Sequence, residues 1–228
     1  MNVITRVELK NIVFEYQPGQ TIFDGMGFEV PAHKICRLHT EGGPGKSTIL
    51  RMLAGLVSPD DGEIVFNNEV VSNMSFEEFK DYRLRVGYAF DTGGLLSNRS
   101  ILNNLTLPFV YHNVLKLDQA IEYVEEFLKD YHVFDRRHEL PAAVSGGMRK
   151  EACVLRSLLL DPDLLLLDEP FTGLSDRSKQ VFVDQLVKRR KSGACTHVLV
   201  VSDKIESLTG LIDQELYIES KPAERAVA

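Results

Sequence analysis

The chain has 228 residues, and its 26 Lys and Arg against 33 Asp and Glu give a formal net charge of −7 at pH 7. Hydrophobic residues make up 44% and charged residues 26%, a balance typical of a folded globular chain and not of a disordered one. The excess of acids disfavours a nucleic-acid-binding protein, because such surfaces are usually basic. The length favours one α/β domain, or two small ones, with a sizeable core.

Apolar runs and cysteines bear on where the protein works. No apolar run approaches the ~18 residues that a membrane-spanning helix needs, and residues 1–8 lack the apolar stretch of a signal peptide. Cys36, Cys153 and Cys195 are scattered and form no Cys-x-x-Cys pair, which disfavours a disulfide framework or a zinc site. We therefore expect a cytoplasmic protein with reduced, buried thiols.

The first 90 residues combine strand signals with one clear helix. Apolar residues at helical spacing predict a helix over 46–56, directly after a Gly-rich turn at 41–45. The capping-box pattern Ser-Phe-Glu-Glu at 75–78 predicts the start of a second, short helix. The predicted strands of this part are 7–16, 28–31, 34–38, 63–66 and 86–90.

The remainder begins with a helical insert, from about Asp91 to Leu160, and then returns to alternating strands and helices. The four leucines at 164–167 predict a strand in the middle of a parallel sheet that is covered on both faces. Residues 219–228 resemble a frayed tail. The predicted helices are 102–111, 117–130, 148–160 and 181–190, and the predicted strands are 164–167, 197–201 and 215–218.

The turn between the strand at 34–38 and the first helix has the composition of a phosphate-binding loop. Residues 40–47 nearly match G-x-x-x-x-G-K-[ST], with Thr40 in place of the first glycine. The glycines allow backbone N–H groups to converge on phosphate oxygens, and the helix directs its positive end at the same anion. We predict that Lys46 reaches the β- and γ-phosphates and that the Ser47 hydroxyl completes Mg²⁺ coordination. The predicted phosphate-site residues are Gly42, Gly43, Gly45, Lys46, Ser47 and Thr48.

The strand at 164–167 is followed by two acids, Asp168 and Glu169. Carboxylates at this end of a parallel strand lie at the sheet edge where open α/β folds bind ligands. We predict that Asp168 holds Mg²⁺ through water and that Glu169 polarises the water that attacks the nucleotide. Acids also follow buried strands for no functional reason. The pair alone is therefore weak evidence for a nucleotide site, and the Lys46–Ser47 motif strengthens it. Together they predict a P-loop nucleoside triphosphatase that binds ATP and Mg²⁺.

Residues 144–150, Val-Ser-Gly-Gly-Met-Arg-Lys, resemble the signature sequence of ABC-type ATPases, and Ser145 precedes Asp168 by 23 residues. Tyr16 resembles the aromatic residue that stacks on adenine in this family. The resemblance implies an α/β P-loop NTPase fold with a RecA-like core, an antiparallel β edge subdomain and an inserted α-helical subdomain. It implies one ATPase domain over 1–228, with 1–90 and 161–228 as the nucleotide-binding core and 91–160 as the helical signature subdomain.

The same resemblance implies partners. In this family the Ser-Gly-Gly of one subunit closes over the γ-phosphate held by another, so Ser145, Gly146 and Gly147 imply a homo- or heterodimer of ATPase subunits. A separate membrane-spanning subunit would carry the transport path and dock near 91–111, which places the protein on the inner face of the cytoplasmic membrane. Residues 145–150 and 90–96 also resemble the Mla/Mce-type lipid-transport ATPases, which implies phospholipid transport.

Four positions depart from the family pattern. Asp91 stands where the family has a Gln that touches Mg²⁺, and we expect it to serve as a metal ligand. Ser202 stands where the family has the switch His that contacts the γ-phosphate. Ser175-Asp176 replaces an Asp-Pro, and Thr40 replaces a loop glycine. We expect firm ATP binding and slow hydrolysis, because the loss of one transition-state donor typically costs ~10²–10³-fold.

Two other classes stay open at this point. The chain could be a degenerate ATP-binding subunit that regulates or clamps an assembly with little hydrolysis. It could also be a soluble ABC-type ATPase that acts on nucleic acid or ribosomes, although the charge of −7 disfavours this class. A GTPase is disfavoured further, because the sequence has no Asn-Lys-x-Asp guanine-reading motif.

Overall fold

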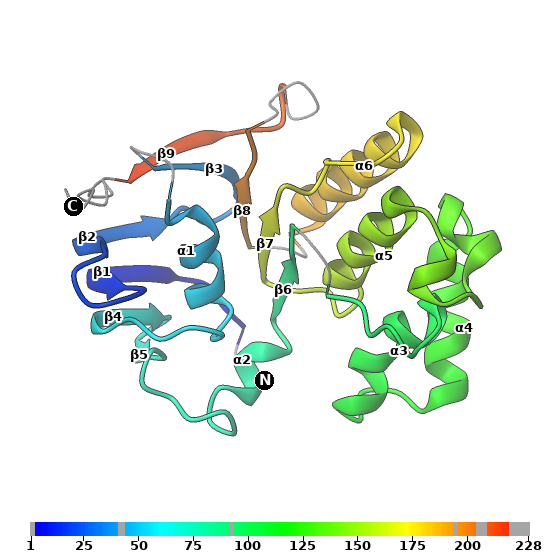
Figure 1. Cartoon of the computed structure of the whole chain (residues 1–228), viewed down its shortest axis with the longest axis horizontal. Coiled ribbons are helices and arrows are strands. Elements are labelled where there is room, and N and C mark those ends of the chain that lie inside the picture. Colours follow the sequence, from blue (N-terminus) through cyan, green and yellow to red (C-terminus); the bar gives the residue numbers. More distant parts are fainter. Residues whose placement is uncertain (1–2, 41–43, 92–93, 194–195, 204–208, 219–228) are drawn as a thin grey trace.

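The computed structural model describes residues 3–40, 44–91, 94–193, 196–203 and 209–218. Two sheets and a lobe of helices make up the molecule (Figure 1). The strands are β1 (Val7–Glu15), β2 (Thr21–Val30), β3 (Lys34–Thr40), β4 (Asp61–Phe66), β5 (Glu69–Val70), β6 (Val86–Ala89), β7 (Leu164–Asp168), β8 (His197–Val201) and β9 (Gln214–Ile218). The helices are α1 (Lys46–Leu53), α2 (Lys80–Arg83), α3 (Ile101–Tyr111), α4 (Leu117–Leu128), α5 (Gly146–Leu158) and α6 (Asp176–Ser192), with 3₁₀ turns η1 (His132–Arg136) and η2 (Pro141–Ala143).

The two sheets differ in strand direction. The first has the order β2-β1-β4-β5, and its pairs are antiparallel. The second has the order β6-β7-β8-β3-β9, and its pairs are parallel. Because parallel strands end at the same edge, the residues that follow β3, β6, β7 and β8 converge there. This edge brings together the phosphate loop, Asp91, the acid pair and Ser202.

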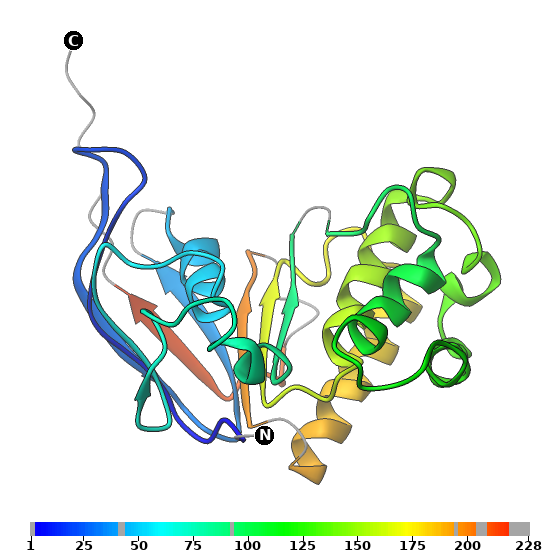
Figure 2. The same cartoon turned by 90° about the horizontal axis from the view of Figure 1, so that it is seen from below.

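Helix α1 lies between the two sheets, and the α5–α6 side covers the far face of the parallel sheet (Figures 1 and 2). The leucines of β7 divide accordingly. Leu164 and Leu166 belong to the core around α1, whereas Leu165 and Leu167 pack with Phe182 and its neighbours on the other face. All four leucines have no exposed surface, which confirms the prediction of a central strand covered on both faces.

Several predicted bounds change in the structure. The predicted strand at 28–31 is the end of a longer strand, β2, whose start at Thr21 was hidden by Gly25 and Gly27. Strand β5 was not predicted. Helix α6 runs from 176 to 192 and exceeds the predicted 181–190, because its polar first turn carries no apolar period. Ser75 and Glu78 form the hydrogen bonds of a capping box, but a turn follows and α2 begins only at Lys80.

The segment from 91 to 160 contains α3, α4 and α5, which share a core of their own around Leu105, Val124 and Leu155. Helix α5 also packs on β6, and Val154 and Leu158 face the parallel sheet. The lobe is therefore attached to the sheet mainly through α5. Within the described ranges, no helix is long and apolar enough to span a membrane.

Candidate functional site

The phosphate loop ends in a strained turn that only glycine accommodates. Gly45 has a φ of 108°, and a Cβ there would lie 2.7 Å from the Phe23 ring. Lys46 follows as the first residue of α1, whose first turn carries no acid to neutralise its positive end. Gly42 and Gly43, predicted to bind phosphate, lie outside the described residues. The described part of the loop therefore presents a lysine and a helix N-terminus at the carboxyl edge of the sheet.

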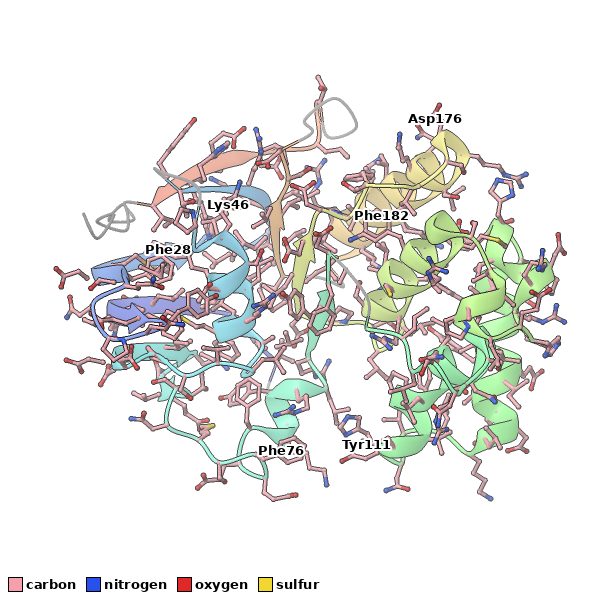
Figure 3. All side chains as sticks on the ribbon, in the orientation of Figure 1. Phe28, Lys46, Phe76, Tyr111, Asp176 and Phe182 are labelled. Carbon is pink, nitrogen blue, oxygen red and sulfur yellow. The ribbon has the colours of Figure 1, made fainter. Side chains whose placement is uncertain are left out.

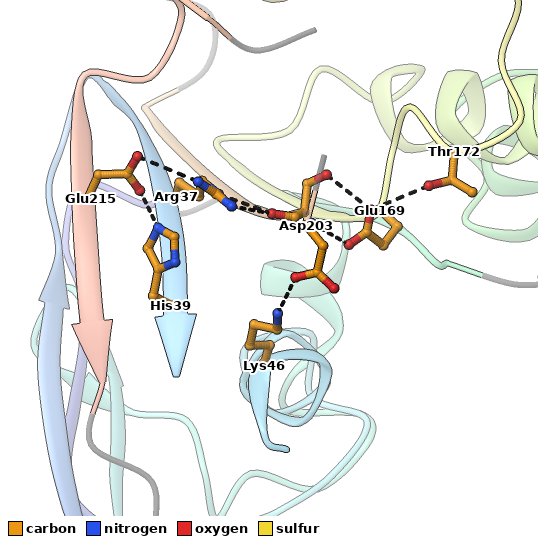
Figure 4. Close-up of polar contacts among 8 residues, drawn as sticks. Arg37, His39, Lys46, Glu169, Thr172, Asp203 and Glu215 are labelled. Atoms are coloured by element: carbon orange, nitrogen blue, oxygen red, sulfur yellow. Dashed lines mark hydrogen bonds and ion pairs between the residues drawn. The ribbon is translucent and has the colours of Figure 1, made fainter. Parts of the chain in front are cut away.

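Lys46 is engaged by an acid that the sequence analysis did not select. Its Nζ donates a 2.7 Å hydrogen bond to Oδ1 of Asp203, the second residue after β8 (Figure 4). The lysine side chain is 22% exposed and the aspartate side chain 79%, so the pair lies at the solvent edge of the site. This bond lowers the pKa of the Asp203 carboxyl below its usual value. Lys46, the predicted phosphate-binding cation, thus already has an anionic partner in Asp203.

Glu169 is held in a fixed orientation by groups from two loops. Its Oε1 accepts a 2.7 Å hydrogen bond from the Asp203 backbone N–H, and its Oε2 accepts from the hydroxyls of Ser202 at 3.0 Å and Thr172 at 3.4 Å. Its backbone has a φ of 44°, unusual for a non-glycine residue, and its N–H donates to the Val201 carbonyl at 2.8 Å. Such backbone strain is often found where a side chain must be presented to a ligand.

A buried arginine fixes the loop that carries Ser202. The Arg37 guanidinium donates two hydrogen bonds to the Ser202 carbonyl, at 3.1 and 2.7 Å, and lies 3.9 Å from Glu215 on β9 (Figure 4). Glu215 also bonds His39 at 2.6 Å. Arg37 and Glu215 thus connect the edge strand β9 to the loop after β8. The loop that carries Ser202, which bonds Glu169, is therefore fixed in position.

Asp168 and Asp91 are the carboxylates available to a divalent cation. Asp168 is 4% exposed, and burial raises the pKa of its carboxyl, an effect that the Ser47 hydroxyl and Lys150 partly offset. Asp91 lies close enough to raise that pKa further. One buried carboxylate, a serine hydroxyl and a second acid are hard oxygen donors, and Mg²⁺ is usually held by one or two carboxylates together with substrate phosphates. The donor set therefore fits Mg²⁺.

Lys150 connects the helical lobe to this edge of the sheet. Its Nζ donates to the carbonyls of Phe90 at 2.8 Å, Asp91 at 2.9 Å and Asp168 at 3.0 Å. It also lies 3.8 Å from the Asp91 carboxylate. Burial lowers the pKa of Lys150, since the charged ammonium has lost water on most sides. The lysine fixes the positions of both potential metal-binding acids through their backbones.

Tyr16 and Thr48 meet beside the phosphate loop. The Tyr16 hydroxyl bonds the Thr48 Oγ1, and its ring, 52% exposed, stands edge-on to Phe14. An exposed aromatic face next to the start of α1 suits stacking on a planar base. The nucleotide-base role of Tyr16 stays a prediction.

The predicted signature segment forms the start of α5. The Ser145 hydroxyl accepts a 3.2 Å hydrogen bond from the Met148 N–H and caps the helix. Gly147 packs against the backbone of the loop after β7, because a Cβ there would lie 2.5 Å from the Gly173 carbonyl oxygen. In the same loop, Ser175 caps α6. The structure thus brings the signature segment and the segment at 173–176 into direct contact.

Residues 23–172 match the family model of the ABC transporter proteins. The chain belongs to the ABC transporter family. It is similar to the intermembrane phospholipid transport system ATP-binding protein MlaF of Haemophilus influenzae, with 30% identity over 207 residues that cover 91% of this chain and 78% of the relative. The corresponding MlaF of Escherichia coli K12 is 28% identical over 220 residues, 96% of this chain and 81% of the relative.

Solved ABC cassettes share the fold. A dimeric ATP-binding cassette in a post-hydrolysis state, bound to ADP and Pi, superposes with a TM-score of 0.84 at 21% identity, covering 94% of this chain and 96% of that one. The chain is thus an ATP-binding subunit of an ABC transporter, and the comparisons do not favour the regulatory alternative. The α/β P-loop fold with its antiparallel sheet is also confirmed.

In this ABC subunit, the Ser202 hydroxyl donates to Glu169, and the adjacent Asp203 contacts Lys46. The nucleotide-binding role of Ser202 stays a prediction. Sequence reasoning missed Asp203 and Lys150. The available signal for Asp203 was its place just after a buried parallel strand, where acids converge on the ligand edge.

Proposed function

We propose that this chain hydrolyses ATP to energise phospholipid transport by a membrane-spanning subunit. The observation that carries hydrolysis is the fixed Glu169 carboxylate, which lies at the same sheet edge as Lys46 and accepts hydrogen bonds from Ser202 and Asp203. The role of the MlaF relatives in intermembrane phospholipid transport supports phospholipid as the cargo. The chain would work on the inner face of the cytoplasmic membrane.

We infer the following roles within the nucleotide site. Lys46 and the N–H groups of the loop bind the phosphates, with Gly42, Gly43, Gly45 and Thr48 shaping or extending the loop. Tyr16 stacks on the base. Ser47, Asp168 and Asp91 would hold Mg²⁺, which when bound neutralises charge on the phosphate oxygens. This division treats 1–228 as one ATPase domain, with 91–160 as its helical part.

The contacts of Glu169 suggest how a proton moves. Glu169 is placed to accept a proton from the attacking water through an oxygen that its own partners leave available. Each hydrogen bond that it accepts stabilises the carboxylate and so weakens it as a base. The Asp203 carboxylate competes with phosphate for the charge of Lys46. Both effects, together with the missing switch His, support slow turnover.

Two copies of an ATPase subunit would form the working unit. Ser145, Gly146 and Gly147 would close over the γ-phosphate held by the other subunit, and the contact of Gly147 with Gly173 would link that event to the neighbouring loop. A cavity of about 490 Å³ lies between Asp91 and the first turn of α5, beside the predicted docking region. Residues 91–111 would face the membrane subunit.

Phosphate release by the purified transporter complex tests this proposal. We expect ATP-dependent phosphate release that Glu169→Gln lowers by ~10²–10³-fold while ATP binding is retained. Equal phosphate release by the wild type and Glu169→Gln would contradict the hydrolytic role. A wild-type rate equal to that of other ABC ATPases, abolished by Glu169→Gln, would contradict slow turnover alone. Radiolabelled phospholipid moved between vesicles tests the cargo, and a lack of ATP-dependent movement would contradict it.

A further inference from the structure

Arg37 is a charged residue in the interior of the parallel sheet. It lies on β3, between β8 and β9, and it is only 6% exposed. The strand register pairs it with Val200 on one side and with Glu215 on the other. Glu215 lies 3.9 Å from the guanidinium and its side chain is 37% exposed, so this ion pair offsets only part of the cost of burying the charge. The burial of Arg37 therefore depends mainly on its hydrogen bonds.

The hydrogen bonds of Arg37 converge on a single backbone group. Its Nε and Nη2 atoms both donate to the Ser202 carbonyl, at 3.1 and 2.7 Å. Because the donor is charged, each bond is stronger than a bond between neutral groups, and two donors of one planar guanidinium restrict both the position and the direction of the oxygen. Arg37 therefore holds the peptide unit that joins Ser202 to Asp203.

The same peptide unit contacts the proposed catalytic carboxylate on its other side. Its N–H, which belongs to Asp203, donates to Oε1 of Glu169 at 2.7 Å (Figure 4). The C=O and N–H of a planar trans peptide point in opposite directions, so a fixed carbonyl also fixes the N–H. The bonds at the carbonyl also polarise the peptide and strengthen the N–H as a donor. The Ser202 hydroxyl, which donates to Oε2 at 3.0 Å, belongs to the residue on the carbonyl side of this peptide.

We propose that Arg37 is a positioning residue for ATP hydrolysis, which orients the Glu169 carboxylate through the Ser202–Asp203 peptide. Without Arg37 the Asp203 N–H can still bond Glu169, so the carboxylate keeps its hydrogen bonds. The fixed direction is lost, because the peptide and the carboxylate can then shift together, and a misplacement of ~1 Å can lower a rate by ~10²-fold. The inference rests on the proposed function, because that function makes Glu169 the group that accepts the proton from water.

The first experiment compares turnover with ATP affinity. Arg37→Met replaces the guanidinium by an apolar side chain, in the full chain within its purified transporter complex. We expect kcat for phosphate release to fall by ~10- to 100-fold, while the equilibrium affinity for a non-hydrolysable ATP analogue does not weaken, because Lys46 and the first turn of α1 are unchanged. Arg37→Lys keeps the charge and should recover part of the rate. An unchanged kcat, or a loss of affinity as large as the loss of kcat, would overturn the proposal.

Arg189→Met is the matched control. Arg189 is also buried, at 9% exposed, and it bonds Asp161, shortly before β7 begins and therefore away from the nucleotide edge. Its helix, α6, begins at Asp176, across the parallel sheet from Lys46 (Figure 3). Arg189→Met should therefore lower stability but leave kcat unchanged. A similar fall of kcat in both variants would assign the effect of Arg37 to general destabilisation and overturn the positioning role.

A double-mutant cycle tests whether Arg37 acts through Glu169. On a Glu169→Gln background, Arg37→Met should cause no further loss in single-turnover hydrolysis of ATP, because the carboxylate that Arg37 orients is gone. Losses that multiply would show that Arg37 acts independently of Glu169 and would overturn the proposal. Arg37→Lys is measured in the same cycle, so the test remains decisive if Arg37→Met does not fold.

The outcomes separate the two proposals. Equal phosphate release by the wild type and Glu169→Gln contradicts the proposed function. Hydrolysis that depends on Glu169 and not on Arg37 contradicts the positioning role alone. Hydrolysis that depends on both residues, with losses that do not multiply, supports both proposals.

Discussion

Asp203→Asn should tighten ATP binding, because the Asp203 carboxylate competes with phosphate for Lys46. The wild-type pair is a 2.7 Å contact whose aspartate is 79% exposed, so its own worth is within the ~0–1 kcal/mol of surface ion pairs. The same carboxylate repels the incoming triphosphate, and one unit charge ~5 Å away adds ~1 kcal/mol in water-like surroundings. Asp203→Asn removes both the ion pair with Lys46 and this repulsion. The free energy of ATP binding should therefore become more favourable by ~1–2 kcal/mol, which corresponds to ~5- to 30-fold tighter binding.

The assay is equilibrium binding of ATP by calorimetry on a Glu169→Gln background, which prevents turnover. Asparagine keeps the backbone N–H that bonds Glu169, so the carboxamide removes the charge without moving that side chain. Glu126→Gln, which removes an exposed acid paired with Lys129 on the helical lobe, is the matched control. The gain should shrink as salt rises. Unchanged or weaker ATP binding would refute the reasoning and assign Asp203 a supporting role in binding the nucleotide.

Three further results are expected. Burial lowers the pKa of His197 to about 4, so the unfolded chain binds more protons than the folded chain between about pH 6.5 and 4. The free energy of unfolding, measured in urea, should therefore fall by ~3 kcal/mol as the pH is lowered through that range. His197→Val should flatten this dependence of stability on pH. Burial raises the pKa of Cys36 to about 11, so a thiol reagent at pH 7.5 should label Cys36 only after denaturation. Gly147→Ala should cost ~1–3 kcal/mol of stability, because its Cβ would lie 2.5 Å from the Gly173 carbonyl oxygen. Gly146→Ala is the control and should cost far less, because the Cβ there would meet its nearest neighbour at 3.7 Å. Equal losses of stability in the two variants would contradict the packing argument.

Local signals predicted much of the fold. The apolar β7, the helical period of α1 and the glycine and serine punctuation at 145–147 are each visible within a few residues, and the structure has the elements that they predict. Strand β2 was largely missed because glycines interrupt its alternation, and α6 was shortened because polar residues fill its first turn. These errors arise where tertiary pairing, and not local preference, fixes an element.

The candidate site was less predictable than the fold. Lys46 and Glu169 could be selected because each belongs to a short motif with its own chemistry. The contact of Lys46 with Asp203 joins positions 157 residues apart, and no local pattern distinguishes Asp203 from other acids that follow strands. Lys150 reaches the Phe90 carbonyl across 60 residues, and such contacts become visible only when the parallel strands are assembled.

The three carbonyl contacts of Lys150 connect the helical lobe to the parallel sheet. Its ammonium group belongs to α5, yet it grips the ends of β6 and β7 through the carbonyls of Phe90, Asp91 and Asp168. A tilt of α5 must therefore either carry these two strand ends along or break buried hydrogen bonds to a charged group, which is expensive. A movement of the helical lobe therefore shifts Asp91 and Asp168 at the nucleotide edge, and it changes the affinity of these two acids for a metal ion.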